Sequence, residues 1–291
     1  MRIRSLKSVL ALSCGLLSLA LSAGAQEDKA LPLKPFADAD HVLYTPAKEG
    51  AKRLPVKAVN LTYHGGPVIT SAKVVFIFWG PSFATGGADH TYATTLQADR
   101  NQFGTTGEYN VITQYTNGSG THIQLANLGS GTADMFDTTT PPTNVTDSNV
   151  KSEVNKYLST HTYNSSTIYE VVIPSTSYSS SGTSTSCGGP SLAYCAYHGH
   201  FSGSSGDVKY SIEPWPGCSG CKVSGWTDVL NAERFFCRET REAVTDPDLN
   251  AWWDSSGNEC DDKCGTPYIA ANGYACETVW SNACQCCVQT R

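Results

Sequence analysis

The sequence lacks the signatures of several common classes of protein. No segment after residue 25 contains 18 consecutive apolar residues, so no later part of the chain is expected to span a membrane. No G-x-S-x-G elbow and no glycine-rich phosphate loop occur, which argues against a serine hydrolase and against a P-loop nucleotide hydrolase. Basic residues are also scarce, with 20 Lys and Arg against 26 Asp and Glu, so a nucleic-acid partner is not expected.

Residues 1–25 have the pattern of a secretory signal peptide. Arg2, Arg4 and Lys7 form a positive end, an apolar run follows, and an A-x-A-like cleavage site ends at Ala25. Removing this segment leaves 291 − 25 = 266 residues and changes the net charge from −6 to −9, because three basic residues leave with it. We therefore expect an acidic protein that is secreted to the extracellular space or the periplasm.

The mature chain is predicted to consist of a leader and one domain. Residues 26–58 are polar and contain four prolines, which indicates an extended leader or a propeptide. The apolar patterning begins near Leu61, so we assign residues 59–291 to a single domain.

Cysteine is absent from the mature chain before Cys187, so the first half of the domain must rely on its own core. Eleven of the twelve cysteines lie between Cys187 and Cys287, which in a secreted chain predicts disulfides. Because eleven is odd, one thiol is left over or pairs between chains, and Cys237, within a predicted helix, is a candidate for it. Zinc binding by Cys218-x-x-Cys221 is less expected, since no second C-x-x-C follows at zinc-finger spacing. The leading disulfide candidates are Cys187, Cys195, Cys218, Cys221, Cys264 and Cys284.

The order of apolar runs predicts an α/β domain with a mixed β-sheet and flanking helices. Short runs rich in β-branched and aromatic residues predict strands at 73–79, 123–128, 167–173 and 208–213. Helical patterns cover 90–103, 109–115, 148–159 and 227–245. The segments 129–146 and 175–186 have the composition of loops.

The segment R-E-T-R-E-A-V-T-D-P, residues 238–247, is the most informative motif. In H-E-x-x-H, two histidines one helical turn apart bind zinc and the intervening glutamate acts as general base. Here Arg238 replaces the first histidine and Glu242 the second, while Glu239 keeps the position of the base. The simpler interpretation is an ordinary i, i+4 ion pair between Arg238 and Glu242. Arg cannot deprotonate in a protein, so it cannot itself be a ligand.

Other side chains could complete a metal site. Glu259 and Asp262 follow the helix, and carboxylate ligands alone would favour calcium or magnesium over zinc. His198 and His200 stand two residues apart and could chelate a metal from one face of a strand, although ordinary structural histidines are commoner.

Adjacent tryptophans offer a different kind of binding surface. On an extended segment Trp252 and Trp253 point in opposite directions, so we expect one of them to be exposed and available to stack on a sugar ring. A purely structural role in the core is the alternative.

Several of these motifs occur in an order that resembles a known family. LTYHGGPVI (61–69), VVFIFWG (74–80), CAYH (195–198) and PGCSGC (216–221) resemble the phosphate-induced protein 1 (EXORDIUM-like) family. A group of secreted bacterial proteins is more similar still, and it shares H-E-x-x-E-A-x-T-D-P followed by A-W-x-D, G-x-E, D-x-C and W-S-N. The matching residues here are Glu239, Glu242-Ala243, Thr245-Asp246-Pro247, Ala251-Trp252, Asp254, Gly257, Glu259, Asp262, Cys264 and Trp280-Ser281-Asn282.

The resemblance implies a zincin-like fold and zinc site. In the bacterial proteins a histidine and a glutamate bind the metal, and the glutamate between them is the base. Carried across residue by residue, this nominates Glu239 as base, Glu242 as ligand, and Glu259 or Asp262 as a further ligand. The histidine does not carry over, because Arg238 stands in its place. Plant members lack the H-E pair and are regarded as extracellular growth-related proteins without a settled activity.

The sequence is therefore compatible with two functions. In the first, the zincin-like site is degenerate and the secreted protein acts by binding a cell-surface or wall glycan, or a peptide, through Arg238, Trp252 and Trp253. In the second, it is an active metal-dependent, peptidase-like hydrolase with Glu239 as general base and His198 or His200 as the substituted ligand. A histidine nitrogen near the Glu242 carboxylate favours the second function, and a guanidinium filling that space favours the first.

Overall fold

The computed structural model describes residues 41–43 and 59–291. The predicted signal peptide at 1–25 and most of the predicted leader at 26–58 lie outside the described residues. In the part of the chain that is described, no helix combines the length and the apolar character needed to cross a membrane. The helices are α1 (His90–Phe103), α2 (Gly107–Asn110), α3 (Asp147–Leu158) and α4 (Asp228–Thr245), with 3-10 turns η1 (Pro81–Phe83) and η2 (Val111–Gln114).

The largest sheet has six strands in the order β1-β9-β10-β6-β3-β4. The pairs β10/β6, β6/β3 and β3/β4 are parallel, whereas β9/β10 and β1/β9 are antiparallel, so the sheet is mixed as predicted. Its strands are β1 (His41–Leu43), β9 (Tyr197–Gly203), β10 (Gly206–Glu213), β6 (Thr167–Val172), β3 (Lys73–Trp79) and β4 (Met135–Asp137).

Four smaller sheets complete the domain. Three of them lie in the C-terminal part or link it to the start of the domain. In the fourth, the serine-rich middle strand pairs with one short strand on each side. Their strands are β2 (Thr62–Tyr63) with β11 (Trp252–Trp253), β12 (Pro267–Ile269) with β13 (Ala275–Glu277), β14 (Val279–Ser281) with β15 (Cys286–Val288), and β5 (Asn144–Thr146) with β7 (Tyr178–Ser181) and β8 (Ser184–Thr185).

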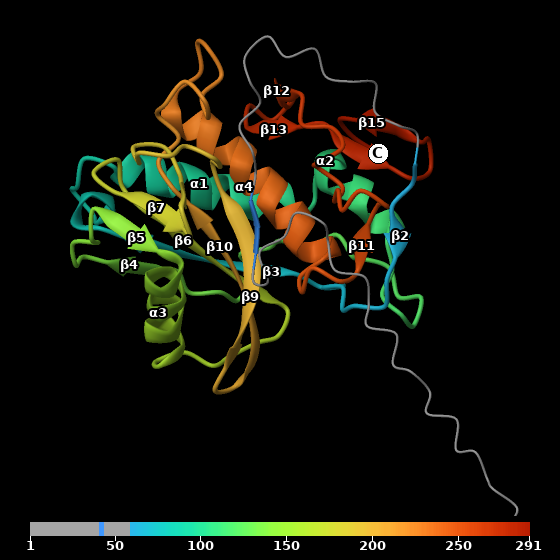
Figure 1. The fold of residues 1–291 in the computed structure, drawn as a ribbon, viewed down its shortest axis with the longest axis horizontal. Helices are drawn as coiled ribbons and strands as arrows, with labels where there is room; N and C mark the ends of the chain where they lie inside the picture. Colours follow the sequence, from blue (N-terminus) through green and yellow to red (C-terminus); the bar gives the residue numbers. More distant parts are fainter. Residues whose placement is uncertain (1–40, 44–58) are drawn as a thin grey trace, which may run out of the picture. The chain divides into compact units, whose positions relative to one another are not determined.

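Helices cover both faces of the large sheet (Figure 1). Side chains alternate between faces along a strand, and β3 shows the consequence. Phe76 and Phe78 belong to the core cluster that includes α1 and α4, whereas Val75 and Ile77 pack in a second cluster with α3. The strand is therefore apolar throughout, which is the pattern of a central strand buried on both faces.

The helix α4 lies across one face of the sheet (Figure 1). Thr227 caps it by accepting a hydrogen bond from the Leu230 backbone N–H, and Pro247 follows the last turn, where it cannot continue the helix. Phe236 on α4 lies 5.4 Å, between ring centroids, from Phe76 on β3. Ring packing of this kind fixes the helix against the sheet.

Most predicted elements are present, and the misses have physical reasons. The predicted strand at 123–128 is a loop, and the predicted helix at 109–115 is divided between α2 and η2. The predicted loop at 175–186 contains β7 and β8, while that at 129–146 contains β4 and β5. Serines are buried in β7 because their hydroxyls find partners, as between Ser179 Oγ and Tyr194 Oη at 2.8 Å.

The cysteines form five disulfides in the C-terminal half. All six leading candidates are paired, and the C-x-x-C cysteines bond to different partners. The prediction of an unpaired Cys237 is wrong: this residue faces β13 from α4 and bonds to Cys276, and the free cysteine of the described residues is the buried Cys260. The pairs are Cys187–Cys218, Cys195–Cys221, Cys237–Cys276, Cys264–Cys287 and Cys284–Cys286.

The contact between α4 and the sheet predicts a large effect of one aromatic truncation. Phe236 is fully buried, between Phe76 and Phe103. Phe236→Ala should lower the free energy of unfolding by about 3–5 kcal/mol through lost burial and a residual cavity. Leu125→Ala is the matched control, because Leu125 is 46% exposed, and should change it by less than about 0.5 kcal/mol. Urea unfolding of the oxidised protein measures both, and equal effects would contradict the packing described.

Candidate functional site

Helix α4 buries an unusual number of charges along most of its length. From Asn231 to Thr245 every residue is buried, and six of them are charged. Charged side chains are almost never fully buried unless they are paired, so their partners define the polar centre of the molecule. The six are Glu233, Arg234, Arg238, Glu239, Arg241 and Glu242.

Arg238 lies at the middle of this centre. Its Nη2 is 3.1 Å from Glu242 Oε1 and also contacts Asp262 Oδ1. Its Nε is 3.7 Å from Glu239 Oε1, and its Nη1 is 3.7 Å from Glu277 Oε2. The predicted i, i+4 pair is thus present, but it belongs to a network of four carboxylates, of which three are buried and Asp262 is partly exposed, and not to a solvated helix face.

The loop after α4 brings further acids to the helix. Arg241 Nε donates to Asp261 Oδ2 at 3.1 Å, which fixes the loop one turn beyond Arg238. The Asp262 backbone N–H donates to Glu242 Oε1 at 3.2 Å, and the Glu259 N–H donates to Asp262 Oδ2 at 2.9 Å. These bonds hold Glu259 and Asp262 beside the motif helix.

Asp254 and Asp261, the other acids of this loop, lie outside the cluster's centre. Asp261 pairs with Arg241, whereas Asp254 accepts from Lys263 Nζ at 2.7 Å and from the Asn258 side chain. Both therefore act as structural anchors of the loop.

His198 reaches the same place from strand β9. Its Nε2 lies 3.2 Å from Glu259 Oε2, and both side chains are fully buried. His198, Glu242 and Glu259 each offer one ligand atom, and the three atoms lie within 4.8 Å of one another. The sequence proposed His198 as one of two candidate histidines, and the fold brings this one to the carboxylates.

His200 lies elsewhere. Its Nδ1 is 3.0 Å from Asp207 Oδ1, at the partly exposed hairpin of β9 and β10. Asp248 completes this second group, but Lys209 Nζ already contacts both carboxylates and supplies a positive charge there.

The sheet beneath α4 adds a row of polar side chains. Glu170 on β6, Ser211 on β10 and His198 on β9 are in register, so they share the face that α4 covers. Glu213 lies two residues after Ser211 on that face. Burial raises the pKa of Glu170 to about 7, with Glu213, Ser211 and Arg100 opposing the rise. Burial raises the pKa of Glu213 well above its usual range, and the charges of Glu170 and Glu239 add to the rise.

Glu239, the predicted base, is enclosed by other charges. Burial raises the pKa of Glu239 well above its usual range; Arg238 opposes the rise, and the charges of Glu259 and Asp262 add to it. Without a further cation, the cluster therefore favours the protonated form of this carboxyl.

Neither of the adjacent tryptophans belongs to the cluster. Trp253 is buried and stacks on the His64 ring with 3.5 Å between ring centroids. Trp252 is half-buried, packs against Tyr63, and donates its indole N–H to Thr116 O at 2.8 Å. Little of either ring face is available to stack on a sugar.

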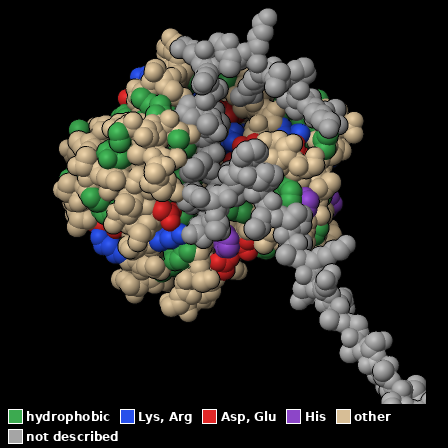
Figure 2. Space-filling view, in the orientation of Figure 1, with side chains coloured by type: hydrophobic (Ala, Val, Ile, Leu, Met, Phe, Trp, Pro, Cys, Tyr) green, Lys and Arg blue, Asp and Glu red, His purple; other side chains and the backbone are tan. Residues whose placement is uncertain are grey.

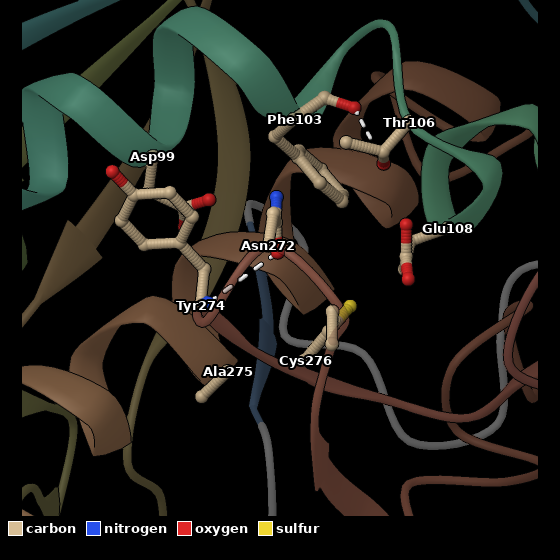
Figure 3. A pocket seen from close by; sticks show the side chains of 9 residues that line it. Asp99, Phe103, Thr106, Glu108, Asn272, Tyr274, Ala275 and Cys276 are labelled. Atoms are coloured by element: carbon tan, nitrogen blue, oxygen red, sulfur yellow. Dashed lines mark hydrogen bonds between the residues drawn. The ribbon is translucent and has the colours of Figure 1, made fainter.

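A small cavity lies between α1 and the segment that carries β13 (Figure 3). Asp99, Phe103 and Tyr274 line it, together with Cys276 of the disulfide to Cys237. Its volume is about 10 Å³, room for a single water and not for a ligand.

Comparison with protein-family models, with curated proteins and with solved structures finds no match to this chain. The resemblance to EXORDIUM-like proteins and to bacterial zincin-like proteins therefore stays an expectation, and the site has to be interpreted from its own geometry.

Sequence reasoning missed the acids that come from the sheet and the C-terminal strands. Glu170 lies inside an apolar strand, T-I-Y-E-V-V, where a charge is costly, and this was a signal that a polar partner lies opposite. Glu277 follows Cys276, whose disulfide to Cys237 joins β13 to α4 beside Arg238. The sequence could not assign this disulfide, so it gave no reason to place Glu277 near Arg238.

The buried acids under α4 predict a pH-dependent stability. The pKa of Glu170 rises from 4.5 to about 7 on folding, so its contribution is fully present below pH 4.5 and is lost as pH rises through about 7. Between these values Glu170 should lower the free energy of unfolding by up to about 1.4 kcal/mol per pH unit. Glu170→Gln should flatten that slope in urea unfolding with a chelator present. An unchanged slope would contradict a protonated Glu170.

Proposed function

We propose that His198, Glu242 and Glu259 hold a divalent metal ion, zinc by preference, and that the protein is a secreted metal-dependent hydrolase of peptide-type bonds. Three protein ligands with one position left open are typical of catalytic zinc sites. An imidazole among the ligands favours zinc over calcium or magnesium. The observation that carries the proposal is the fully buried set of three ligand atoms within 4.8 Å of one another.

The charge balance of the cluster also supports a cation. Among the described residues, Glu239, Glu242 and Asp262 contact the guanidinium of Arg238, and Glu259 lies beside Asp262. Fully ionised, these five side chains carry a net charge of −3, which is costly to bury. Protons or a divalent cation would reduce the excess, and the His198 imidazole supplies the neutral donor that a metal needs.

The arrangement explains how a site can exist without the first histidine of H-E-x-x-H. The guanidinium of Arg238 cannot bind a metal, so the vacant ligand role passes to His198 on the neighbouring strand. Arg238 instead holds Glu242 and Asp262 in place, at 3.1 Å from Glu242 Oε1. It acts as a positioning residue that offsets part of the carboxylate charge.

The residues can be assigned roles in hydrolysis. When bound, zinc acts as a Lewis acid and lowers the pKa of water. Glu239 lies three residues before Glu242 on α4. It is the group that would accept a proton from the attacking water and return it to the leaving group. Glu239 Oε1 is buried and lies 3.7 Å from Arg238 Nε, and this positive charge favours the ionised form of the carboxylate.

Secretion is compatible with this role. The five disulfides indicate an oxidising compartment, such as the extracellular space or the periplasm. A peptide fits the proposed site better than a glycan, because the tryptophans suited to a sugar are packed against other rings.

The proposal predicts zinc binding that depends on one histidine and not on its neighbour. The purified wild-type protein should contain about one zinc per chain by mass spectrometry of the metal, removable by a chelator. His198→Ala should weaken zinc affinity by at least about 100-fold, because one of three ligands is lost. His200→Ala is the matched control on the same strand and should retain the metal.

Glu239→Gln separates binding from hydrolysis. This variant should keep its zinc and lose at least about 100-fold in the hydrolysis of a peptide library, since only the base is changed. A wild-type protein without zinc, or equal zinc loss in His198→Ala and His200→Ala, would contradict the proposal.

A second candidate function rests on a different observation. Arg238 Nη2 is 3.1 Å from Glu242 Oε1, so a permanent cation already occupies part of the space beside the ligands. This favours a degenerate site in a secreted protein that acts by binding a surface glycan or a peptide. Arg238 would then neutralise carboxylates that once held a metal.

Restoring the missing histidine distinguishes the two candidates. For a degenerate site, wild-type protein takes up no zinc and Arg238→His gains a stoichiometric site. For the hydrolase proposed above, wild-type protein already binds zinc, and Arg238→His leaves the stoichiometry at about one. Isothermal titration with zinc chloride measures both variants. A gain confined to Arg238→His would overturn the hydrolase assignment.

A further inference from the structure

Two buried glutamates beneath α4 take no part in the proposed zinc site. Glu170 on β6 is 0% exposed, and Glu213, the last residue of β10, is 1% exposed. In the part of the chain that the structure describes, no hydrogen-bond donor contacts any of their four carboxylate oxygens. Burying a carboxylate in this way is costly unless a proton or a cation neutralises it.

The hydroxyl of Ser211 belongs to the same group. In the parallel register of β10 and β6, Ser211 lies opposite Glu170, and Glu213 is two residues further along β10. The three side chains therefore leave the sheet on one face. Ser211 is fully buried, and among the described residues its Oγ also has no hydrogen-bond partner of ordinary geometry. Because Ser211 and Glu213 are both close enough to Glu170 to lower its pKa, the three side chains converge.

The helices that enclose this group add acids to it. Glu239 on α4 and Asp99 on α1 contribute further carboxyl groups. Arg100 supplies positive charge near Glu170, but its guanidinium already pairs with Asp134. On the face drawn in Figure 2, the visible acidic side chains lie at the surface, where water can solvate them. The acids beneath α4 lack that contact with solvent, so their negative charge is not offset by hydration.

The chemistry of the group selects the kind of cation that it would hold. Glu170, Glu213 and Ser211 together offer five oxygens, and oxygen ligands without nitrogen or sulfur favour calcium or magnesium over zinc. Magnesium gives up its bound waters reluctantly and requires near-ideal octahedral geometry. Calcium accepts bidentate carboxylates in irregular geometry, so it fits a site closed to solvent better.

This group is separate from the proposed zinc site. Strand β10 lies between β9, which carries His198, and β6, which carries Glu170. Neighbouring strands are about 5 Å apart, so the backbones at these two residues are about 10 Å apart. The zinc site also includes an imidazole nitrogen, whereas the second group is built from oxygens alone. The two sites therefore differ in both position and ligand chemistry.

We propose that Glu170, Glu213 and Ser211 form a second cation site, which binds calcium between β6 and β10 beneath α4. The inference goes beyond the proposed hydrolase, because it requires neither zinc nor catalysis. Calcium bound there would join the two strands through their side chains. Since the unfolded chain does not bring these residues together, calcium would also stabilise the folded domain.

The test uses the mature chain from residue 26, freed of metal with a chelator and titrated with calcium chloride in a calorimeter. Wild type should bind about one calcium per chain, and its thermal unfolding midpoint should rise with calcium concentration. Glu213→Gln should weaken calcium binding at least about ten-fold, because a charged ligand is lost. Ser211→Ala should cause a smaller loss, since a neutral ligand is removed.

Two controls separate a ligand from a residue that only supports the fold. Glu153→Gln changes another buried glutamate whose pKa is raised to about 7, but this one lies on α3 beside Lys156, and calcium binding should be unchanged. With chelator present, Glu213→Gln should be no less stable than wild type, because the amide removes a like charge beside Glu170. A merely structural role would make this variant less stable with and without calcium.

Three results would overturn the proposal: no calcium response of wild type, an equal response to magnesium chloride, or an unchanged calcium affinity in Glu213→Gln. His198→Ala should keep its calcium response, and loss of that response would merge the two sites and also overturn the proposal. Wild type that binds calcium but no zinc would refute the hydrolase assignment and leave the calcium site in place.

Discussion

The guanidinium of Arg238 is the interaction on which the centre of this molecule depends. It lies in the buried part of α4 and contacts carboxylates of the helix, of the loop after it and of β13. A buried charge is tolerated only when it is paired and hydrogen-bonded. Three segments must therefore meet at one point: helix α4, the loop that carries Glu259, and strand β13, which contains Cys276. The disulfide from Cys237 to Cys276, beside this point, fixes the same approach.

Among the described residues, the cluster carries more negative than positive charge. Glu239, Glu242, Glu259 and Asp262 outnumber Arg238, and Glu170 and Glu213 add acids from the sheet below. Burial raises the pKa values of Glu239 and Glu242, and protonation of these carboxyls would reduce the negative charge. A cation beside His198 would reduce it without protons, and the imidazole there is already in contact with Glu259. Metal binding and proton binding are thus competing solutions to the same electrostatic problem.

The sequence predicted the parts of this account that depend on local pattern. The helix that carries Arg238, Glu239 and Glu242 and the strand at 73–79 follow from periodicity and from proline and glycine at their ends. What could not be predicted depends on contacts between distant segments. The pairing of Cys237, the choice of His198 over His200 and the burial of Glu170 all require the order of strands in the sheet. The serine-rich strand β7 was missed because its composition is that of a linker. The sequence does not show that its hydroxyls have buried hydrogen-bond partners, such as Tyr194 for Ser179.

The central claim is that His198, Glu242 and Glu259 form a metal centre despite Arg238. Anomalous X-ray diffraction at the zinc absorption edge, from crystals grown with zinc chloride, tests it most directly. The account predicts one strong peak between His198 Nε2 and the two carboxylates, with Arg238 still bound to Asp262. No peak at that position, with the His198 imidazole still contacting Glu259, would contradict it and leave Arg238 as the residue that replaced the metal.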